Sequence, residues 1–317
     1  MPDSLRIDAL YGSFVARLPP ELRSAGAELP FRLGLVPRPS ITWSQAFKHA
    51  VTLQAPELLI DGTSGVDARL VDRAVLAHLL AVIEAFGADR VADGQVTASL
   101  ELAAVLEQVR LARDEALFEL YGEPAVELAS DADRRTHQAI VSEQQRFGED
   151  DPVPFSLYEA ISSGKQAVGL TAGVALGKAL GWRADRTELV RSTLMNIALG
   201  LQFQDDVVDW EADFVRGGAW ALLLARHELD NASKPVDLAE ARALVLSSGV
   251  LAELLMSSET AYRNARLGAE ELGAVALAHW ADEREREARD FHENERKTPG
   301  FLLRLKQLGP WAAEVFG

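Results

Sequence analysis

The spacing of the apolar residues constrains the fold of this chain more than any other feature. From about Gly65 onward, apolar side chains recur every three or four positions, and clusters of β-branched residues are few. This period gathers apolar side chains on one face of an α-helix, whereas a half-buried strand would need strict alternation. Ala, Leu, Glu and Arg, which dominate the chain, also favour helices. The sequence therefore predicts an all-α protein.

Residues typical of turns divide the periodic region into segments. Breaks are expected at Gly122-Glu123-Pro124, at residues 148–154, at Gly181-Trp182 and around residues 231–235. The expected helices cover residues 66–92, 97–121, 125–146, 155–182, 185–214, 216–228, 236–263 and 267–296, with a short tail helix at 300–308.

The organisation along the chain predicts a single domain over residues 1–317. Prolines concentrate between Pro19 and Pro39, so residues 1–64 are expected to form an irregular N-terminal segment with short helices. Residues 65–317 are expected to form the helical core. We find no Gly-, Ser- or Pro-rich linker and no internal repeat that would divide the chain further.

Charge and composition exclude several functional classes. With 48 acidic and 32 basic residues, the chain carries a formal net charge of −16, which disfavours nucleic acid and anionic membrane surfaces as partners. The chain has no cysteine, which excludes disulfides and thiolate chemistry. No apolar stretch reaches the roughly 18 residues that a transmembrane helix needs. With no signal-peptide pattern visible either, we expect a cytoplasmic protein without a transmembrane segment.

The motif with the clearest chemical meaning is an acidic stripe. On a helix, its members fall at i, i+3, i+4, i+7 and i+11, and so share one face: Gln202, Asp205, Asp206, Asp209 and Asp213. Like charges at this spacing repel, and no basic residue occurs between Arg191 and Arg216 to pair with them locally. Carboxylates in an otherwise apolar segment suit Mg²⁺, which prefers oxygen ligands. The alternative is a solvated helix face paired with arginines elsewhere.

A second acidic pair occurs upstream. Asp89 and Asp93 are four residues apart at the end of an expected helix whose apolar stripe includes Phe86. Acidic residues near helix ends are common, so this pair means little on its own. Together, the two motifs predict two helices that face each other and present carboxylates to shared metal ions.

These residues resemble a known pattern. Gln202-x-x-Asp205-Asp206-x-x-Asp209, with Asp213 four residues later, resembles the second aspartate-rich motif of the class I terpenoid synthase and trans-prenyl diphosphate synthase superfamily. Gly164-Lys165-Gln166 resembles the segment whose lysine grips diphosphate in that superfamily. Asp89-Arg90-Val91-Ala92-Asp93 takes the place of its first aspartate-rich motif. The resemblance covers roughly residues 66–230, and it implies the helical bundle of the class I terpenoid synthases.

The resemblance also implies roles for individual residues. The implied cofactor is Mg²⁺, three ions in this superfamily, and the implied substrate is a prenyl diphosphate; homodimers are common among such folds. The implied metal ligands are Asp89, Asp93, Asp205, Asp209 and Asp213, and the implied catalytic residues are Asp89, Asp93, Asp205, Asp206 and Asp209. The implied substrate-binding residues are Lys165, Gln202, Phe86, Phe203 and Arg216, with Arg134 and Arg135 as further candidates for diphosphate.

The first aspartate-rich motif departs from the superfamily pattern, and these departures bear on which reaction we expect. Arg90 stands where the superfamily has the second aspartate of its first motif, and the tandem arginine that follows in chain-elongating synthases is missing. We therefore expect a Mg²⁺-dependent terpene synthase, a carbon–oxygen lyase that ionises a linear prenyl diphosphate, releases pyrophosphate and cyclises or quenches the cation. The alternatives are a prenyltransferase, either chain-elongating or of the head-to-head squalene and phytoene type, and a non-catalytic helical partner subunit.

Overall fold

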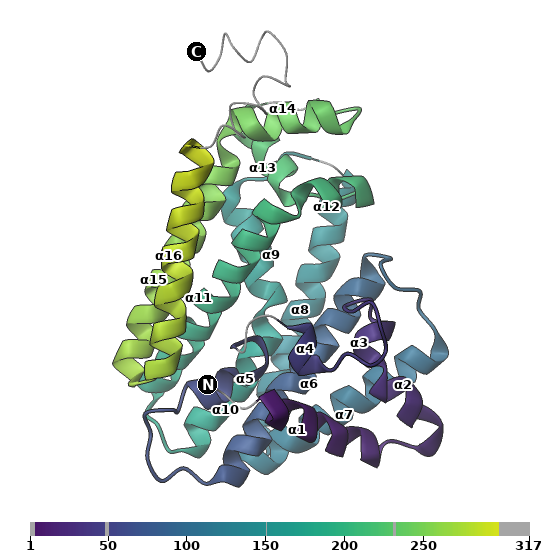
Figure 1. The fold of residues 1–317 in the computed structure, drawn as a ribbon, viewed down its shortest axis with the longest axis vertical. Helices are drawn as coiled ribbons and strands as arrows, with labels where there is room; N and C mark the ends of the chain where they lie inside the picture. The colour runs from purple at the N-terminus through teal and green to yellow at the C-terminus, as the bar shows by residue number, and fades with distance from the viewer. Residues whose placement is uncertain (1–3, 48–50, 150, 231–232, 298–317) are drawn as a thin grey trace. The chain divides into compact units, whose positions relative to one another are not determined.

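The fold is all-α, as predicted. The computed structural model describes residues 4–47, 51–149, 151–230 and 233–297, and over these residues the chain forms helices and no strand (Figure 1). The expected tail helix at 300–308 lies outside the described residues. Among the described helices, none combines the length and the apolar character needed to cross a membrane.

The chain divides into two compact units. The first unit comprises Met1–Ile140, Gly164–Met195 and Leu267–His279, and the second comprises Val141–Ser163, Asn196–Arg266 and Trp280–Gly317. The boundaries fall inside helices α8 (Glu123–Glu149), α9 (Phe155–Lys165), α11 (Ala184–Val208), α15 (Val250–Leu272) and α16 (Val275–Lys297). The organisation as a single domain stays a prediction.

The N-terminal segment is more helical than expected. It contains α1 (Ser4–Arg17), the 3₁₀ turn η1 (Pro20–Leu22), α2 (Arg23–Ala27), α3 (Leu29–Arg32), α4 (Trp43–Ala46) and α5 (Val51–Leu58). The short helices were expected, but the 14-residue α1 was not. Its apolar positions Ile7, Tyr11 and Phe14, followed by Leu18, repeat at helical spacing and are all buried. This stripe lies before Pro19, so the prolines of residues 19–39 do not interrupt it.

Helix α6 (Ala68–Ala92) is the centre of the first unit. It begins at the N-cap Asp67, whose side chain accepts a hydrogen bond from the backbone N–H of Arg69. Its neighbours include α5 and α7 (Leu100–Tyr121). At Gly87, an added Cβ would lie 2.7 Å from a methyl group of Leu106, so a larger residue there would force the Leu106 side chain to move. Both helices match the predicted spans to within three residues.

The predicted helix over residues 155–182 is wrong, because the chain breaks it near Gln166. The structure has α9, then the 3₁₀ turn η2 (Ala167–Leu170) and α10 (Thr171–Ala179). The hydroxyl of Thr136 donates to the backbone carbonyls of Gly164 and Lys165, at 3.2 and 3.3 Å. These carbonyls at the end of α9 therefore find a partner outside the helix. That partner lies 28 residues upstream of Gly164, beyond the reach of a local pattern.

Several other helices begin or end at different residues than predicted. The predicted helix at 185–214 divides into α11 and α12 (Trp210–Arg216), and the one at 216–228 begins later, as α13 (Trp220–Glu228). The predicted span 236–263 divides into α14 (Leu238–Ser248) and α15 at Gly249, and α15 runs on to Leu272 before Gly273. Both glycines have positive φ, 78° and 74°, a conformation that ends helices and that glycine adopts at little cost.

His78 gives the first unit a specific dependence on pH. Its ring is buried on α6, where Nε2 lies 3.0 Å from the carbonyl oxygen of Thr52. Burial lowers the pKa of His78 to about 4. An unfolded histidine titrates near pH 6.5, so the unfolded chain binds the extra proton first, and stability falls as the pH drops from 6.5 to 4.

We expect this histidine to contribute a loss of about 3 kcal/mol over that range. Urea unfolding at pH 7 and pH 4.5 measures it, with His78→Gln as the comparison. The variant should lose less stability on acidification than the original chain. Equal losses in the two proteins would contradict the assignment.

Candidate functional site

The predicted acidic stripe is present in the second unit. Asp205 lies on α11, Asp209 is the N-cap of α12, and Asp213 is on α12. Although α11 ends at Val208, helical hydrogen bonds continue through the break, from Asp209 N to Asp205 O at 2.8 Å and from Asp213 N to Asp209 O at 3.0 Å. The three aspartates therefore follow one another at one-turn intervals. Asp205 and Asp209 are exposed, and Asp213 is half-buried.

Asp206 lies apart from the exposed acids, because its side chain is buried. Its carboxylate accepts a hydrogen bond from the hydroxyl of Tyr158, and both of its oxygens lie 3.2 Å from Nε2 of Gln202. Burial raises the pKa of Asp206 to about 7, while the bonds from Tyr158 and Gln202 oppose this rise. The stripe therefore has two kinds of member, with Asp205 and Asp209 open to solvent and Asp206 held inside the protein.

A buried aromatic cluster surrounds this contact. The ring of Tyr158 lies 5.7 Å from that of Phe203 and 5.2 Å from that of Trp220. Nε1 of Trp220 donates to Oε1 of Glu143 at 2.7 Å. Phe203 is a predicted substrate-binding residue, whereas Tyr158, Trp220 and Glu143 were not predicted. No spacing in the sequence connects Tyr158, Trp220 and Glu143 with Asp206, because they come from α9, α13, α8 and α11.

Phe203 also lines a groove of the second unit with a volume of about 250 Å³. Leu199, Met256 and Ala261 contribute further apolar surface to this groove, whereas Glu159 and Glu253 contribute carboxylates. Phe203 itself is 2% exposed, so most of its ring packs against Tyr158 and Phe155. Its contribution to the core is visible in the structure, and its contact with a substrate stays a prediction.

Arg216 pairs with a member of the stripe. Its guanidinium lies 2.7 Å from the carboxylate of Asp213, and its side chain is half exposed. Burial raises the pKa of Asp213, and the charge of Arg216 opposes that rise. This ion pair partly neutralises Asp213, whose side chain is also less exposed than those of Asp205 and Asp209.

In the first unit, the structure brings together two of the predicted residues. Nζ of Lys165, at the end of α9, lies 2.8 Å from the carboxylate of Asp89 in the last turn of α6. Asp93 follows as the exposed C-cap of α6. The lysine expected to bind diphosphate therefore pairs with an aspartate of the first motif.

The neighbours of Asp89 have structural contacts. Nη1 of Arg90 donates to the backbone carbonyls of Leu33 and Gly34, at 3.1 and 3.3 Å, and so fixes the N-terminal segment against α6. Phe86 is half-buried and packs against Phe47, with ring centroids 5.3 Å apart. The two arginines named as further candidates for diphosphate lie exposed on α8, where Arg134 pairs with Asp131 at 2.6 Å, next to Arg135.

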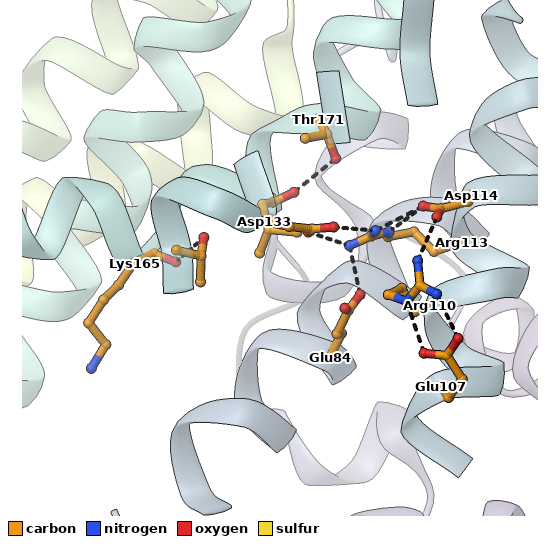
Figure 2. Close-up of polar contacts among 10 residues, drawn as sticks. Glu84, Glu107, Arg110, Arg113, Asp114, Asp133, Lys165 and Thr171 are labelled. Carbon is orange, nitrogen blue, oxygen red and sulfur yellow. Dashed lines mark hydrogen bonds and ion pairs between the residues drawn. The ribbon is translucent and has the colours of Figure 1, made fainter. Parts of the chain in front are cut away.

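The buried Arg113 forms an ionic cluster with three half-buried carboxylates, which no sequence motif indicated (Figure 2). Its guanidinium donates to Glu84 at 2.6 Å, to both carboxylate oxygens of Asp133 at 2.7 Å, and to Asp114 at 2.8 and 3.0 Å. These bonds join α6, α7 and α8 within the first unit. Burial raises the pKa of Glu84 to about 7, although Arg113 opposes the rise. We name these four residues the Arg113 cluster.

The donor set of the stripe fits a divalent cation. Within the described part of the chain, no three histidine or acidic side chains are gathered closely enough to hold a metal ion by themselves. Mg²⁺ does not require such a cage, since it commonly takes one or two protein carboxylates and completes its shell with water and phosphate oxygens. Asp205 and Asp209, exposed and one turn apart, supply such a pair. The sharing of metal ions between this motif and Asp89 with Asp93 stays a prediction.

The fold has counterparts among solved structures. A polyprenyl synthase from Caulobacter crescentus CB15, in complex with calcium and isoprenyl diphosphate, matches with a TM-score of 0.65 and 18% identity over 89% of this chain and 97% of that one. The chain has the polyprenyl synthase fold. A polyprenyl synthetase from Streptomyces coelicolor A3(2) matches with a TM-score of 0.66 and 14% identity, over 87% and 98% of the two chains.

Octaprenyl pyrophosphate synthase from Helicobacter pylori has the same polyprenyl synthase fold, with a TM-score of 0.65 and 13% identity over 89% of this chain and 99% of that one. No protein-family model and no curated protein sequence matches the chain. At these sequence identities, the matches show that the folds are similar. This similarity agrees with the architecture that the aspartate-rich motifs implied.

Proposed function

We propose that this protein is an enzyme that binds an allylic prenyl diphosphate and catalyses the departure of its diphosphate group. The observation that carries the proposal is the exposed pair Asp205 and Asp209, one turn apart across the junction of α11 and α12, with the intervening Asp206 buried. The polyprenyl synthase fold supports it, because solved proteins of this fold include one in complex with calcium and isoprenyl diphosphate.

In this proposal, Asp205 and Asp209 hold divalent cations, which when bound neutralise the diphosphate oxygens as the C–O bond breaks. Asp206 stays buried and orients the end of α11, which carries Asp205 and leads directly into Asp209. Diphosphate binding by Lys165 stays a prediction from the resemblance; in the structure its ammonium group pairs with Asp89. Mg²⁺ as the cation, three ions per site and a homodimeric assembly remain predictions from the resemblance.

Such a site could catalyse either prenyl transfer or terpene synthesis, and the fold favours prenyl transfer. The solved structures of the same fold are named as polyprenyl and octaprenyl pyrophosphate synthases, which supports transfer of the prenyl group to a second substrate. Terpene synthesis from a single substrate, the main expectation from the sequence, is therefore the second candidate.

The first aspartate-rich motif supports this second candidate. Where the resemblance places a second aspartate, Arg90 instead bonds to the carbonyls of Leu33 and Gly34. The segment after Asp93 contains no tandem arginine for a co-substrate diphosphate. Both departures weaken the case for a second diphosphate substrate.

A pyrophosphate-release assay decides between these candidates. Purified protein is incubated with Mg²⁺ and geranyl, farnesyl or geranylgeranyl diphosphate, each with and without isopentenyl diphosphate, and the products are identified by mass spectrometry. Release that requires isopentenyl diphosphate and gives a longer prenyl diphosphate supports elongation. Release from one substrate alone, with a hydrocarbon or alcohol product, supports terpene synthesis, whereas a squalene-like dimer supports head-to-head transfer. No release from any substrate would contradict the proposal and favour a non-catalytic partner subunit.

A further inference from the structure

The contact between Tyr158 and Asp206 joins two helices directly at the acidic stripe. Tyr158 lies on α9 and is 0% exposed, and its hydroxyl donates to the buried carboxylate of Asp206 on α11. Gln202, one turn before Asp206, donates to the same carboxylate. A buried carboxylate requires such donors, because leaving it without them costs far more than leaving a neutral group unbonded.

The tyrosine ring is itself held in place. Trp220 packs against it, with ring centroids 5.2 Å apart, and Phe147 packs against Trp220 at 5.0 Å. The indole N–H of Trp220 is bonded to the buried carboxylate of Glu143. The hydroxyl of Tyr158 therefore has a fixed position, set by side chains from α8 and α13 as well as α9.

Because an α-helix turns by 100° per residue, fixing one side chain fixes the direction of its neighbours. Asp206 is adjacent to Asp205 and three residues before Asp209. We infer that Tyr158 is a positioning residue: through Asp206 it sets the rotation of the end of α11, and so orients toward their cation both Asp205 and Asp209, which is hydrogen-bonded to Asp205 across the α11–α12 junction. This inference rests on the proposed function, since it assigns Tyr158 to the same site.

The chain offers a matched control for this inference. Tyr262 on α15 is also 0% exposed, and its hydroxyl donates to Gln204 Oε1 on the same helix α11, at 2.8 Å. Gln204 is an amide outside the stripe, so this bond ties the same helix without touching an acidic member. Tyr158→Phe and Tyr262→Phe each remove one buried hydroxyl group and, with it, one hydrogen bond to a side chain of α11.

The test measures cation binding in the full-length chain rather than turnover. Mg²⁺ is titrated into each protein in the presence of inorganic pyrophosphate, and the dissociation constant is obtained by calorimetry. Removal of a group that orients a metal ligand weakens metal binding about 10- to 100-fold. We expect a loss in this range for Tyr158→Phe and unchanged affinity for Tyr262→Phe, with similar decreases in melting temperature for the two variants.

The outcomes separate the inference from the proposed function. If the original chain binds no Mg²⁺ with pyrophosphate, the proposed function is wrong and the inference is wrong with it. If the original chain binds and Tyr158→Phe binds equally well, or both variants weaken equally, the inference alone is wrong. Should Tyr158→Phe fail to fold, Trp220→Phe loosens the support of the same ring and is expected to weaken binding; unchanged affinity would overturn the inference.

A double-mutant cycle tests whether Tyr158 acts through Asp206. Residues that act on one contact give non-additive effects, whereas independent residues give fold-changes that multiply. We expect Tyr158→Phe combined with Asp206→Asn to bind Mg²⁺ and pyrophosphate no more weakly than the weaker single variant. A loss equal to the product of the two single losses would show that Tyr158 acts by another route.

Discussion

Replacing Asp205 or Asp209 with asparagine is expected to lower the rate of pyrophosphate release about 10³-fold. The substitution removes one of two exposed carboxylates proposed to hold the cation, and a bound metal supplies several kcal/mol of charge stabilisation in the transition state. Steady-state kinetics with an allylic diphosphate at saturating Mg²⁺ measures the effect. Added Mg²⁺ should restore part of the loss, because the remaining ligands still bind the ion more weakly.

The same two substitutions are expected to leave the stability of the metal-free protein unchanged or slightly higher, although they lower its activity. Each removed aspartate relieves like-charge repulsion at helical spacing, worth a few tenths of a kcal/mol, so the metal-free variants should melt at the same temperature or slightly higher. Glu211→Gln is the matched control, because Glu211 is an acid of α12 that pairs with Arg242 at 2.6 Å. Full activity in Asp205→Asn and Asp209→Asn would contradict the metal site. Equal losses in Glu211→Gln would show that general charge, rather than ligation, is responsible.

Replacing Arg113 with methionine is expected to destabilise the protein by about 3 to 5 kcal/mol, the largest effect on stability among the substitutions considered. Methionine fills a similar volume, but it leaves Glu84, Asp114 and Asp133 without their common cation (Figure 2). The side chain of Arg113 is 1% exposed and those of its three partners are 22–31% exposed, so water replaces only part of the lost bonds. The midpoint and slope of urea unfolding at pH 7 measure the change.

Arg110 provides the control for this prediction. It lies on the same helix, pairs with Glu107 at 2.6 Å and more distantly with Asp114 of the cluster at 3.5 Å, and has a side chain that is 40% exposed, so Arg110→Met should cost at most about 1 kcal/mol. The loss in Arg113→Met should also shrink between pH 7 and pH 5. Burial already raises the pKa of Glu84, and without the opposing charge of Arg113 this carboxylate binds a proton more readily, which removes part of the repulsion among the three acids. A loss of stability as small as that of Arg110→Met would show that the Arg113 cluster is weakly coupled to folding.

The helical architecture could be predicted because it depends on local information. The apolar period gave α6 and α7 to within three residues, and glycines with positive φ explain the ends at Gly249 and Gly273. The break after Lys165 could not be predicted, since it depends on the hydroxyl of Thr136 from another helix. Local propensity carries no information about such distant hydrogen bonds.

In the candidate site, too, local features could be predicted from the sequence and long-range contacts could not. The sequence by itself determined the acidic stripe. Helical spacing follows directly from residue numbers, and the sequence also shows that no basic residue lies near these acids. Only the tertiary structure decided that Asp206 is buried while Asp205 and Asp209 are exposed, that Lys165 pairs with Asp89, and that Arg113 binds three carboxylates. Burial and partner choice arise from residues that are distant in sequence and close in space, and these set the cost of each charge.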